Sequence, residues 1–476
     1  MAERYDLVIV GMGSGGMPAA EFAASLPIRV AVVERGRVGG DCLWTGCVPS
    51  KALLASAKAA HTMRTADRWG LPAVDPEIDT ELVWKRLRAV QTDIAATDDD
   101  PDRYRALGVD VLHGSARIAG PHTVEVDGRP LRARFVLVCT GSRPAEPELP
   151  GLDDAGYLTS ERVFELPRAP RSVTMVGGGP IAVELAQAFT RLGIRTTVLQ
   201  RGSGILPRDE PSLVRTLTGI LRDEGVDLRL DATAERVTVE GDAKVVHGRA
   251  GGEPMRVASE ELFVAVGRTP NVEGLGLEEL GVEVGPRGVA VDDRMRTAVP
   301  SVYAAGDVVG RYLFTHSAAH EAVRAVRDMF FPGRGRVSDL VPWCTFTDPE
   351  LAHVGATSVE AQEAHDGAAE VHRAQLAHSD RARADGHAEG ALVAVTVKGK
   401  LVGAHVLAPA AGELVHELAL AVRDGRSLAS LASLIHVYPT LSTSVAQLSA
   451  EAAFEGAARY RWLVRLGKLG ARVRGR

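Results

Sequence analysis

The chain has 476 residues, of which 45% are hydrophobic and 24% charged, and its formal net charge is −6. This length predicts about three or four domains, and the weakly acidic balance gives no reason to expect a nucleic-acid partner. No stretch reaches the ~18 uninterrupted apolar residues of a membrane span, and the first residues lack the pattern of a signal peptide. With four cysteines, a reducing cytoplasm fits better than secretion.

The chain begins with the elements of a dinucleotide-binding fold in their usual order. An apolar run over residues 5–10 predicts a strand, a helical pattern covers residues 17–26, and a second strand over 29–33 ends at Glu34. The turn between the first strand and the helix carries three glycines, Gly11, Gly13 and Gly16. They permit a tight turn, approach of a pyrophosphate and close helix packing, while the acid is placed to accept hydrogen bonds from a ribose.

Cys42 and Cys47 follow directly and are separated by four residues. Two thiols at this spacing can close a disulfide across roughly one helical turn, and Pro49 suits the first turn of a helix. A helix N-terminus lowers the pKa of a nearby thiol, as a redox thiolate requires. The alternative is a pair of buried structural cysteines. Zinc is disfavoured because no second Cys/His pair has ligand spacing, and we predict no metal site.

A helical stretch follows up to about residue 105, and a second dinucleotide fingerprint lies near the middle of the chain. Strands are predicted over 172–176 and 196–199, with a helix between them that ends near residue 192. The turn holds Gly177 and Gly179, with Ala182 in place of the third glycine, and the second strand leads into Gln200, Arg201 and Arg208. An acid after the second strand would repel a 2′-phosphate, whereas an amide and two guanidiniums attract it. NADPH is therefore favoured over NADH, unless both arginines are ordinary surface charges.

In their order along the chain, these motifs resemble the class I pyridine nucleotide-disulfide oxidoreductases, which include dihydrolipoamide dehydrogenase, glutathione reductase and mercuric reductase. The resemblance covers essentially the whole chain, and the mercuric reductase-like branch is the most similar. Further matching segments are residues 140–144, 267–271 and 303–307. The resemblance implies an α/β fold with two Rossmann-like dinucleotide-binding domains, as in glutathione reductase, and a C-terminal α+β dimerisation domain. It also implies FAD as a cofactor and a homodimer.

The expected domains follow from this resemblance and from Pro and Gly near residue 150. They are an FAD-binding domain over 1–148 and 270–337, an NAD(P)-binding domain over 149–269, a dimerisation domain over 338–458 and a basic tail over 459–476. Within the dimerisation domain, strands are predicted over 391–397 and 401–406, and helices over 412–423 and 444–454.

The resemblance also implies roles for individual residues. Cys47 corresponds to the thiolate that faces the flavin and Cys42 to the interchange thiol that meets the substrate. Lys51 and Glu184 correspond to the ion pair beside flavin N5, where a positive charge stabilises the reduced flavin. Asp307 corresponds to the residue that binds the ribityl chain, close to a helix beginning near residue 317. The other motif positions expected to bind a cofactor are Gly40, Thr140, Gly141, Gly267, Arg268 and Gly306.

Two positions, Tyr438 and Asp41, depart from the family in ways that bear on the chemistry. Tyr438 stands where disulfide reductases of this class carry an acid/base histidine, and a phenol with a pKa near ~10 is a poor base at neutral pH. His436, two residues earlier, would point to the same side in an extended segment and could substitute, unless backbone contacts satisfy it. An aromatic residue at position 438 resembles mercuric reductases, but the tail lacks their vicinal cysteines. Asp41 replaces a threonine, and we expect it to raise the pKa of Cys42 unless it turns to solvent.

The favoured interpretation is an FAD-dependent oxidoreductase that passes hydride from NADPH to the Cys42–Cys47 pair and then to a disulfide or another small acceptor. A metal-ion (mercuric) reductase and a quinone reductase are alternatives. A third is a non-enzymatic flavin redox sensor that docks at a membrane. That alternative depends on residues 459–476, where basic and apolar residues interleave at near-helical spacing. Such a helix can lie on an anionic membrane surface, although a solvated tail would have the same composition.

Overall fold

The computed structural model describes residues 3–331, 333, 335–458 and 462. They divide into two compact units. The first contains the residues up to Ala59, Glu77–Arg201 and Asp227–Asp339. The second contains Ala60–Pro76, Gly202–Val226 and the residues from Leu340 onward. Each unit is interrupted in sequence by segments of the other.

A twisted, mostly parallel sheet begins the first unit. Its strands are β1 (Glu3–Val10), β2 (Val30–Glu34), β3 (Val109–His113), β4 (Ala116–Gly120), β5 (Thr123–Val126), β6 (Arg129–Val138) and β18 (Val302–Ala304). They run in the order β3-β2-β1-β6-β5-β4, with β18 paired to β6. The centre of β1 is fully buried because α1 (Gly16–Ala24) and α10 (Thr315–Phe330) pack small residues into the same core. Burial on both faces is typical of parallel sheets, and the first predicted dinucleotide-binding segment is confirmed.

A helical excursion interrupts this sheet between β2 and β3, as the sequence predicts. Its elements are α2 (Gly40–Trp44), α3 (Cys47–Arg64), a short 3₁₀ turn at Ala66–Trp69, α4 (Thr80–Ala95) and α5 (Pro101–Ala106). Trp84 of α4 is fully buried, and its indole nitrogen donates to the carbonyl of Val163, 2.9 Å away. This contact fixes α4 against α7 (Ser160–Val163).

The second dinucleotide-binding segment builds its own parallel sheet in the order β10-β9-β8-β14. These strands are β8 (Ser172–Val176), β9 (Arg195–Leu199), β10 (Asp227–Arg229) and β14 (Glu261–Val264), and α8 (Pro180–Arg191) connects β8 to β9. The strand, helix and strand predicted from the second fingerprint are therefore present. An antiparallel sheet follows, made of β11 (Ala232–Glu240), β12 (Ala243–Ala250) and β13 (Glu253–Ser259).

A short antiparallel ribbon is formed by two strands that are distant in sequence. One follows β6 of the first sheet, and the other follows β14, before the chain returns to the first sheet at β18. The ribbon pairs β7 (Ser142–Pro144) with β15 (Arg268–Pro270), and Arg143 lies opposite Thr269. The remaining small elements of this unit are α6 (Leu152–Ala155), a 3₁₀ turn at Glu278–Leu280, β16 (Val284–Gly285) and β17 (Gly288–Val289). The ribbon carries residues from two of the family motifs to one place.

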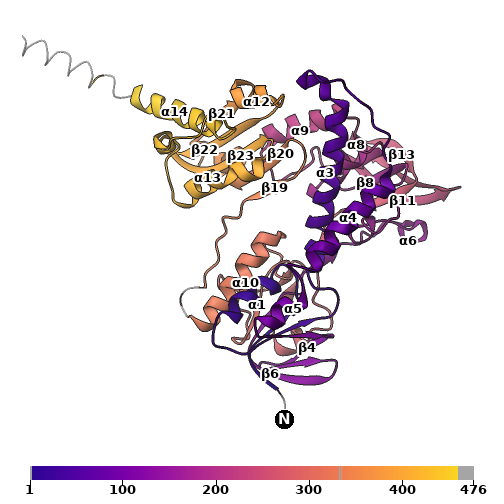
Figure 1. The fold of residues 1–476 in the computed structure, drawn as a ribbon, viewed down its shortest axis with the longest axis vertical. Helices are drawn as coiled ribbons and strands as arrows, with labels where there is room; N and C mark the ends of the chain where they lie inside the picture. Colours follow the sequence, from indigo (N-terminus) through magenta and orange to yellow (C-terminus); the bar gives the residue numbers. More distant parts are fainter. Residues whose placement is uncertain (1–2, 332, 334, 459–461, 463–476) are drawn as a thin grey trace, which may run out of the picture. The chain divides into compact units, whose positions relative to one another are not determined.

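The second unit is built on an antiparallel sheet in the order β19-β20-β23-β22-β21 (Figure 1). The strands are β19 (Trp343–Thr345), β20 (Glu350–Gly355), β21 (Ala369–Gln375), β22 (Ala391–Val397) and β23 (Lys400–Ala408). Its helices are α9 (Pro211–Asp223), α11 (Ser358–Ala364), α12 (Asp380–Ala384), α13 (Ala411–Arg423) and α14 (Thr443–Ala458), with 3₁₀ turns at Leu376–His378 and Leu428–Ser433. Apolar residues of α13 and α14 complete the core of the sheet. The two strands and two helices predicted here are confirmed.

Within the described part of the chain, no helix has both the length and the apolar character needed to cross a membrane. The basic tail over 459–476, and with it the predicted membrane contact, lies outside the described residues except for Trp462.

Candidate functional site

The two thiols lie on two successive helices, a short one and a long one. Cys42 belongs to α2, whereas Cys47 is the first residue of α3, and Thr45 and Gly46 separate the helices. The two thiols therefore do not lie one turn apart on a single continuous helix, because the helix is broken between them. Gly40 has φ +57°, and a Cβ placed on it would come within 2.9 Å of the Cα of Gly13. Only a glycine allows this approach, which brings the dithiol segment against the first nucleotide-binding turn.

Cys47 is placed to be a thiolate. Its side chain lies at the N-terminus of an 18-residue helix, where the helix dipole favours a negative charge. A hydrogen bond from Cys42 lowers the pKa of Cys47 to about 6, with further help from the hydroxyl of Thr315 and the charge of Lys51. The Oγ1 of Thr315 lies 3.3 Å from its Sγ. The same hydrogen bond and burial raise the pKa of Cys42, so the pair is one thiol and one thiolate.

Lys51 and Glu184 form an ion pair next to this thiolate. The Nζ of Lys51 lies 2.8 Å from Oε2 of Glu184, on helices α3 and α8. Glu184 is almost fully buried, whereas the side chain of Lys51 is about one-third exposed. Because Lys51 is one turn after Cys47 on α3, its ammonium lies on the same side of the helix. The pair therefore places one oriented positive charge beside the thiolate.

Asp41 neither turns to solvent nor stays unpaired beside Cys42. Its carboxylate accepts hydrogen bonds from the Thr45 hydroxyl and from Nη2 of Arg268. Arg268 also donates through Nε to the hydroxyl of Ser142, 2.7 Å away. That hydroxyl in turn donates to Asp307 over 2.6 Å. One guanidinium thus connects the dithiol segment with the residue expected to bind the flavin ribityl chain.

The first nucleotide-binding turn has the cradle that an FAD pyrophosphate requires. A Cβ on Gly11 would lie 2.4 Å from the carbonyl oxygen of Cys139, and one on Gly16 would lie 1.9 Å from that of Gly11. Gly13 is less crowded, because a Cβ there would have the Cα of Gly40 as its nearest neighbour, at an ordinary contact distance of 3.6 Å. The carboxylate of Glu34 accepts the backbone N–H of Met12 in the turn and that of Gly36 just after β2, each over 2.7 Å. These residues fit FAD.

The other expected flavin-binding positions frame the same region of the first unit. Gly141 and Gly306 both adopt positive φ, at +69° and +81°, and the N–H of Gly306 donates to buried Glu321 over 2.9 Å. Thr140 donates through its hydroxyl to the carbonyl of Asn271, 2.7 Å away. Gly267, with φ +144°, precedes Arg268 in the ribbon. The structure therefore brings the motif residues of distant segments together.

The second fingerprint has a similar turn. Gly177 has φ +116°, and a Cβ there would lie 2.3 Å from the carbonyl oxygen of Ala265, whereas Gly179 has open space around it. Ala182 is fully buried, as expected for the third fingerprint position. Gln200 packs next to Gly178, and Arg201 is exposed. Arg208 belongs to the second unit, where its guanidinium lies 5.0 Å from the ring centre of Trp343.

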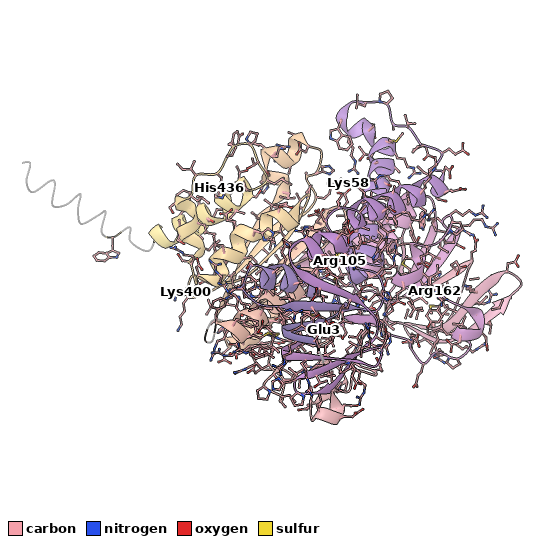
Figure 2. All side chains as sticks on the ribbon, turned by 60° about the horizontal axis from the view of Figure 1, so that its bottom comes forward. Glu3, Lys58, Arg105, Arg162, Lys400 and His436 are labelled. Carbon is pink, nitrogen blue, oxygen red and sulfur yellow. The ribbon has the colours of Figure 1, made fainter. Side chains whose placement is uncertain are left out.

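Tyr438 and His436 do not share one environment. The hydroxyl of Tyr438 donates to Oδ2 of Asp380 over 2.8 Å, which raises the pKa of this 70% exposed phenol. The side chain of His436 is only 5% exposed and lies among the C-terminal elements (Figure 2), with Nε2 3.2 Å from Glu417. The two side chains have different partners, and Nδ1 of His436 also lies 3.2 Å from the backbone oxygen of Leu434, which agrees with the alternative that backbone contacts satisfy this histidine. His436 is held within its own subunit, and Tyr438 is the accessible group.

Several contacts of the site involve residues that the sequence does not single out. They are Thr315 at the thiolate, Asp380 at Tyr438 and Glu417 at His436. Each partner lies between 19 and 268 positions away from the residue it contacts. No local spacing pattern could have indicated them.

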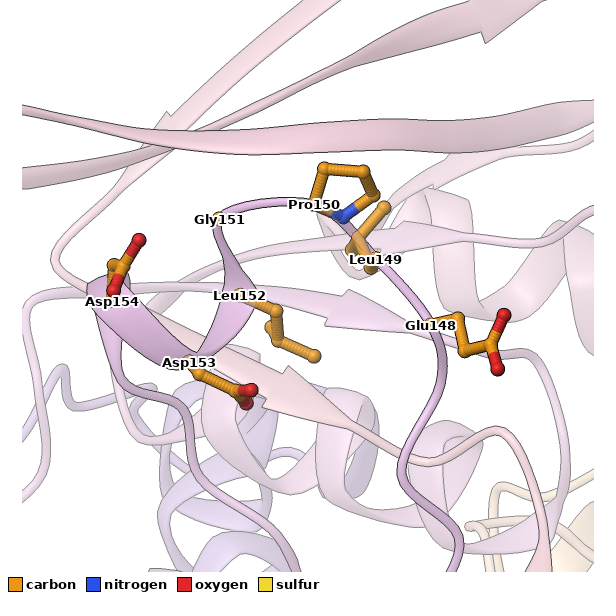
Figure 3. A pocket seen from close by; sticks show the side chains of 7 residues that line it. All are labelled: Glu148, Leu149, Pro150, Gly151, Leu152, Asp153 and Asp154. Atoms are coloured by element: carbon orange, nitrogen blue, oxygen red, sulfur yellow. The ribbon is translucent and has the colours of Figure 1, made fainter.

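An open hollow of about 470 Å³ lies elsewhere in the first unit, formed by residues 148–154 (Figure 3). Its side chains include Glu148, Asp153 and Asp154. None of the cysteine or fingerprint residues lines it, and its acidic character disfavours a phosphate-bearing ligand.

Comparison with protein families gives two matches that together span most of the chain. Residues 5–322 match the pyridine nucleotide-disulphide oxidoreductase model, and residues 341–449 match the dimerisation domain of the same group.

Known proteins of three activities are similar over nearly the whole chain. A mercuric reductase of Streptomyces lividans is 37% identical, over 93% of this chain and 94% of that protein. A dihydrolipoyl dehydrogenase of Thermus scotoductus is 35% identical, over 92% and 95%. The solved Cu(II) complex of the HOCl-induced flavoprotein disulfide reductase RclA from Escherichia coli superposes with a TM-score of 0.82 at 27% identity, over 94% and 99%. The similarity thus extends to proteins with different acceptors.

Proposed function

The chain belongs to the pyridine nucleotide-disulphide oxidoreductase family, and on that premise we propose that it passes hydride from NADPH, through FAD, to Cys42–Cys47 and then to a disulfide substrate. The observation that carries this proposal is the state of Cys47. Its pKa is lowered to about 6, and Lys51, which forms an ion pair with Glu184, lies one helical turn further along α3. A structural cysteine pair has no need of a stabilised thiolate.

Bound FAD would accept a hydride from the nicotinamide and supply an electron pair to the protein disulfide. Gly11, Gly13 and Glu34 would hold its dinucleotide end. The Cys42–Cys47 bond then breaks, with Cys47 left as the thiolate and Cys42 taking up the proton. Lys51 holds its positive charge next to Cys47, where it favours the anionic form. Cys42 then attacks the substrate disulfide, and its proton goes to the sulfur that leaves, so one substrate thiol is released and a mixed disulfide forms. The Cys47 thiolate attacks Cys42 in that mixed disulfide, which restores the Cys42–Cys47 bond and releases the second substrate thiol with a proton from solvent.

The preference for NADPH is supported by the end of β9. Gln200 and exposed Arg201 occupy the positions after the strand, where an acid would otherwise bind the ribose hydroxyls. An arginine can bind a 2′-phosphate through two parallel hydrogen bonds. Arg208 already lies over Trp343, so the preference depends chiefly on Arg201.

A metal ion is a second candidate acceptor. Four similar proteins are named mercuric reductases, and the Escherichia coli relative has been solved as a Cu(II) complex. Cys47 is exposed, and a thiolate is a preferred ligand of soft metal ions. In that reaction the metal ion would be the substrate, because it would take up the electrons that the dithiol supplies.

A homodimer in a reducing, cytoplasmic compartment completes the proposal. The dimerisation-domain match and the exposed Ile435, Val437 and Tyr438 support a second copy as partner. In the dimer, Tyr438 of one subunit would face Cys42 of the other. Since the phenol is held protonated by Asp380, we expect it to orient the substrate rather than act as a base.

Anaerobic reduction with NADPH tests the proposal. We expect a long-wavelength thiolate-to-flavin absorbance in the wild type and its absence in Cys47→Ser. Cys42→Ser should keep the absorbance but lose turnover with disulfides. An acceptor screen with disulfides, quinones and Hg(II) or Cu(II) then follows. Flavin reduction without any involvement of the thiols would refute the proposed function.

A further inference from the structure

Asp41 is the residue immediately before Cys42, and both of its carboxylate oxygens are engaged. Oδ1 accepts the hydroxyl proton of Thr45, and Oδ2 accepts from Nη2 of Arg268. The Asp41 carbonyl also accepts the Thr45 N–H over 2.9 Å. Thr45 lies between the two cysteines, so its contacts with Asp41 join the two ends of the dithiol loop. The bond from Arg268 connects the same loop to β15.

Arg268 is nearly buried, with a side chain only 12% exposed, and it faces two carboxylates. Besides Asp41, its Nε lies 3.5 Å from Oδ2 of Asp307. Nη2 donates to the Ser142 carbonyl over 3.0 Å, and Nε donates to the Ser142 hydroxyl. These contacts fix the plane of the guanidinium, so the side chain has one orientation in which it can hold Asp41 and Asp307 together.

We propose that Asp41 and Arg268 are a positioning pair. Their ion pair holds the loop that carries Cys42 and Cys47 in the geometry needed for disulfide closure, and it fixes the position of that loop relative to Asp307. This inference rests on the proposed function, in which the dithiol and the flavin site must meet. Asp41 and Arg268 do not touch the reacting sulfurs, so they act through the loop. The pair deepens the proposed function by naming what keeps the dithiol in place.

The dithiol loop needs such a tether because its backbone is unusually permissive. Gly39 and Gly40 both have positive φ, at +97° and +57°, and Gly46 separates the two helices. A Cβ on Gly46 would lie 3.0 Å from the Asp41 carbonyl oxygen, which is tighter than an ordinary contact. Glycines leave the reduced loop with many conformations, and a disulfide forms readily only when both sulfurs are held at bonding geometry.

Charge makes the two partners interdependent. Without Arg268, the carboxylates of Asp41 and Asp307 would face one another without a counter-ion. Without Asp41, the Arg268 guanidinium would have Asp307 as its one remaining ion-pair partner. Breaking a partly buried pair by removing one partner is costly because the other charge is left behind. The effects of the two single substitutions should therefore not add.

The test measures the dithiol–disulfide equilibrium of flavin-loaded protein against a glutathione buffer. Two glutathione thiols are oxidised to their disulfide and the Cys42–Cys47 bond is reduced; one proton ends on Cys42 and the other on the buffer, because Cys47 stays a thiolate at neutral pH. For Asp41→Ala we expect a shift of about tenfold toward the dithiol, which is about 30 mV for a two-electron couple. Arg268→Ala should shift it similarly, and the double variant no further. Asp41→Asn keeps an acceptor for Arg268 and should stay within about twofold of the wild type.

Arg143 and Glu273 provide the matched control. They form an ion pair of 2.8 Å in which Arg143 belongs to the same ribbon, and we expect Glu273→Ala to leave the equilibrium unchanged. If Asp41→Ala does not fold, Thr45→Val removes the second contact of the carboxylate and should give a smaller shift in the same direction.

An unchanged equilibrium in Asp41→Ala or Thr45→Val, or fully additive effects of the two alanine substitutions, would overturn the positioning pair. The outcome is separate from that of the proposed function. If NADPH fails to reduce the wild-type disulfide while the glutathione equilibrium still responds to Asp41, the proposed function is wrong and the positioning pair remains.

Discussion

The thiolate of Cys47 is held by contacts that come from three separate parts of the chain. Cys42 belongs to the preceding helix, Lys51 follows on α3, and Thr315 begins α10. Because each contact favours the charged form, the pKa of Cys47 falls to about 6. Reactivity at neutral pH is therefore a property of the assembled site and not of the cysteine motif alone.

Thr315 offers the most selective way to change this pKa. We expect Thr315→Ala to raise the pKa of Cys47 because the thiolate loses a hydrogen-bond partner 3.3 Å away. The pH dependence of iodoacetamide alkylation in the reduced protein measures this, with the midpoint moving up from about 6. Thr315→Ser keeps the hydroxyl and should behave like the wild type. A midpoint that is the same in the alanine variant would show that the hydroxyl does not stabilise the thiolate.

Glu184 orients Lys51, and its charge can be removed with little change in shape. Glu184→Gln should slow reduction of the flavin by NADPH by about tenfold, equivalent to about 1.4 kcal/mol in the barrier, because the ammonium loses its fixed direction. Stopped-flow spectroscopy of the reductive half-reaction measures this rate. Glu261→Gln breaks a comparable pair with Lys244, 2.5 Å apart and mostly buried, and serves as the control. Equal rates in Glu184→Gln and wild type would contradict the assigned role.

The residues of the site divide by how much a sequence can say about them. Short local motifs predict Cys42, Cys47 and the fingerprint glycines, because the spacing of these residues along the chain is enough to indicate their chemistry. The orientation of Asp41 was not predictable, since it depends on Arg268, which is 227 positions away. The sequence leaves two alternatives for His436, because its contact with Glu417 on α13 does not follow from the pattern of the local segment.

At the scale of elements, β20 and β23 carry a buried histidine pair in the second unit. The rings of His353 and His405 are 4.5 Å apart, and His353 stacks on Trp343 at 3.6 Å. Among the described residues, neither Nδ1 has a hydrogen-bond partner. Burial lowers the pKa of His353 to about 2 and also lowers the pKa of His405.

Acid should therefore destabilise this unit. An unfolded histidine binds a proton below pH ~6.5, whereas the folded pair does not, so each histidine can reduce the free energy of unfolding by up to about 1.4 kcal/mol per pH unit below that value.

Asp209, which accepts from the Trp343 indole, opposes this trend, because burial raises its pKa to about 6. A carboxyl with a raised folded pKa gains stability as the pH falls from about 6 to about 4. Arg208, Glu210 and Glu360 are the other charged groups that influence the pair. Two imidazoles outweigh one carboxyl, and the net change is a loss.

We expect His353→Phe to flatten the pH dependence of stability between pH 7 and 5, while the stack on Trp343 is kept. Urea unfolding at a series of pH values measures the slope. His365→Gln, at an exposed position in the same unit, is the control and should leave the slope as it is. If the His353 variant has the same slope as the wild type, the buried ring does not cause the acid sensitivity.

For the whole molecule, the fold class follows from the two fingerprints and is confirmed by the family matches and the sheets. Each fingerprint implies a strand, a turn and a helix, and two copies imply two parallel sheets. What the patterns could not show is that the segment Gly202–Val226 packs with the C-terminal unit. Amphipathic periodicity predicts that α9 buries one face, but not against which sheet.

The exposed apolar residues after the last 3₁₀ turn should form part of the subunit interface. Ile435 is 95% exposed and Val437 76%. A charge at the centre of an apolar interface is strongly unfavourable, so Ile435→Glu should produce monomers in sedimentation velocity experiments. Val239→Glu, at a 55% exposed position on β11, should remain dimeric. Dimers of the Ile435 variant at micromolar concentration would place the interface elsewhere.

The packing of α9 sets a limit on how this protein can be taken apart or recombined. Glu210, at the start of α9, accepts the Ser358 N–H over 2.9 Å, and Arg208 covers Trp343. A fragment cut at the ends of the nucleotide-binding stretch, near residues 149 and 269, would carry α9 away from the strands it covers. Chimaeras with relatives should therefore exchange residues 202–226 together with the C-terminal domain, because a swap that separates them leaves both parents with unmatched buried surfaces.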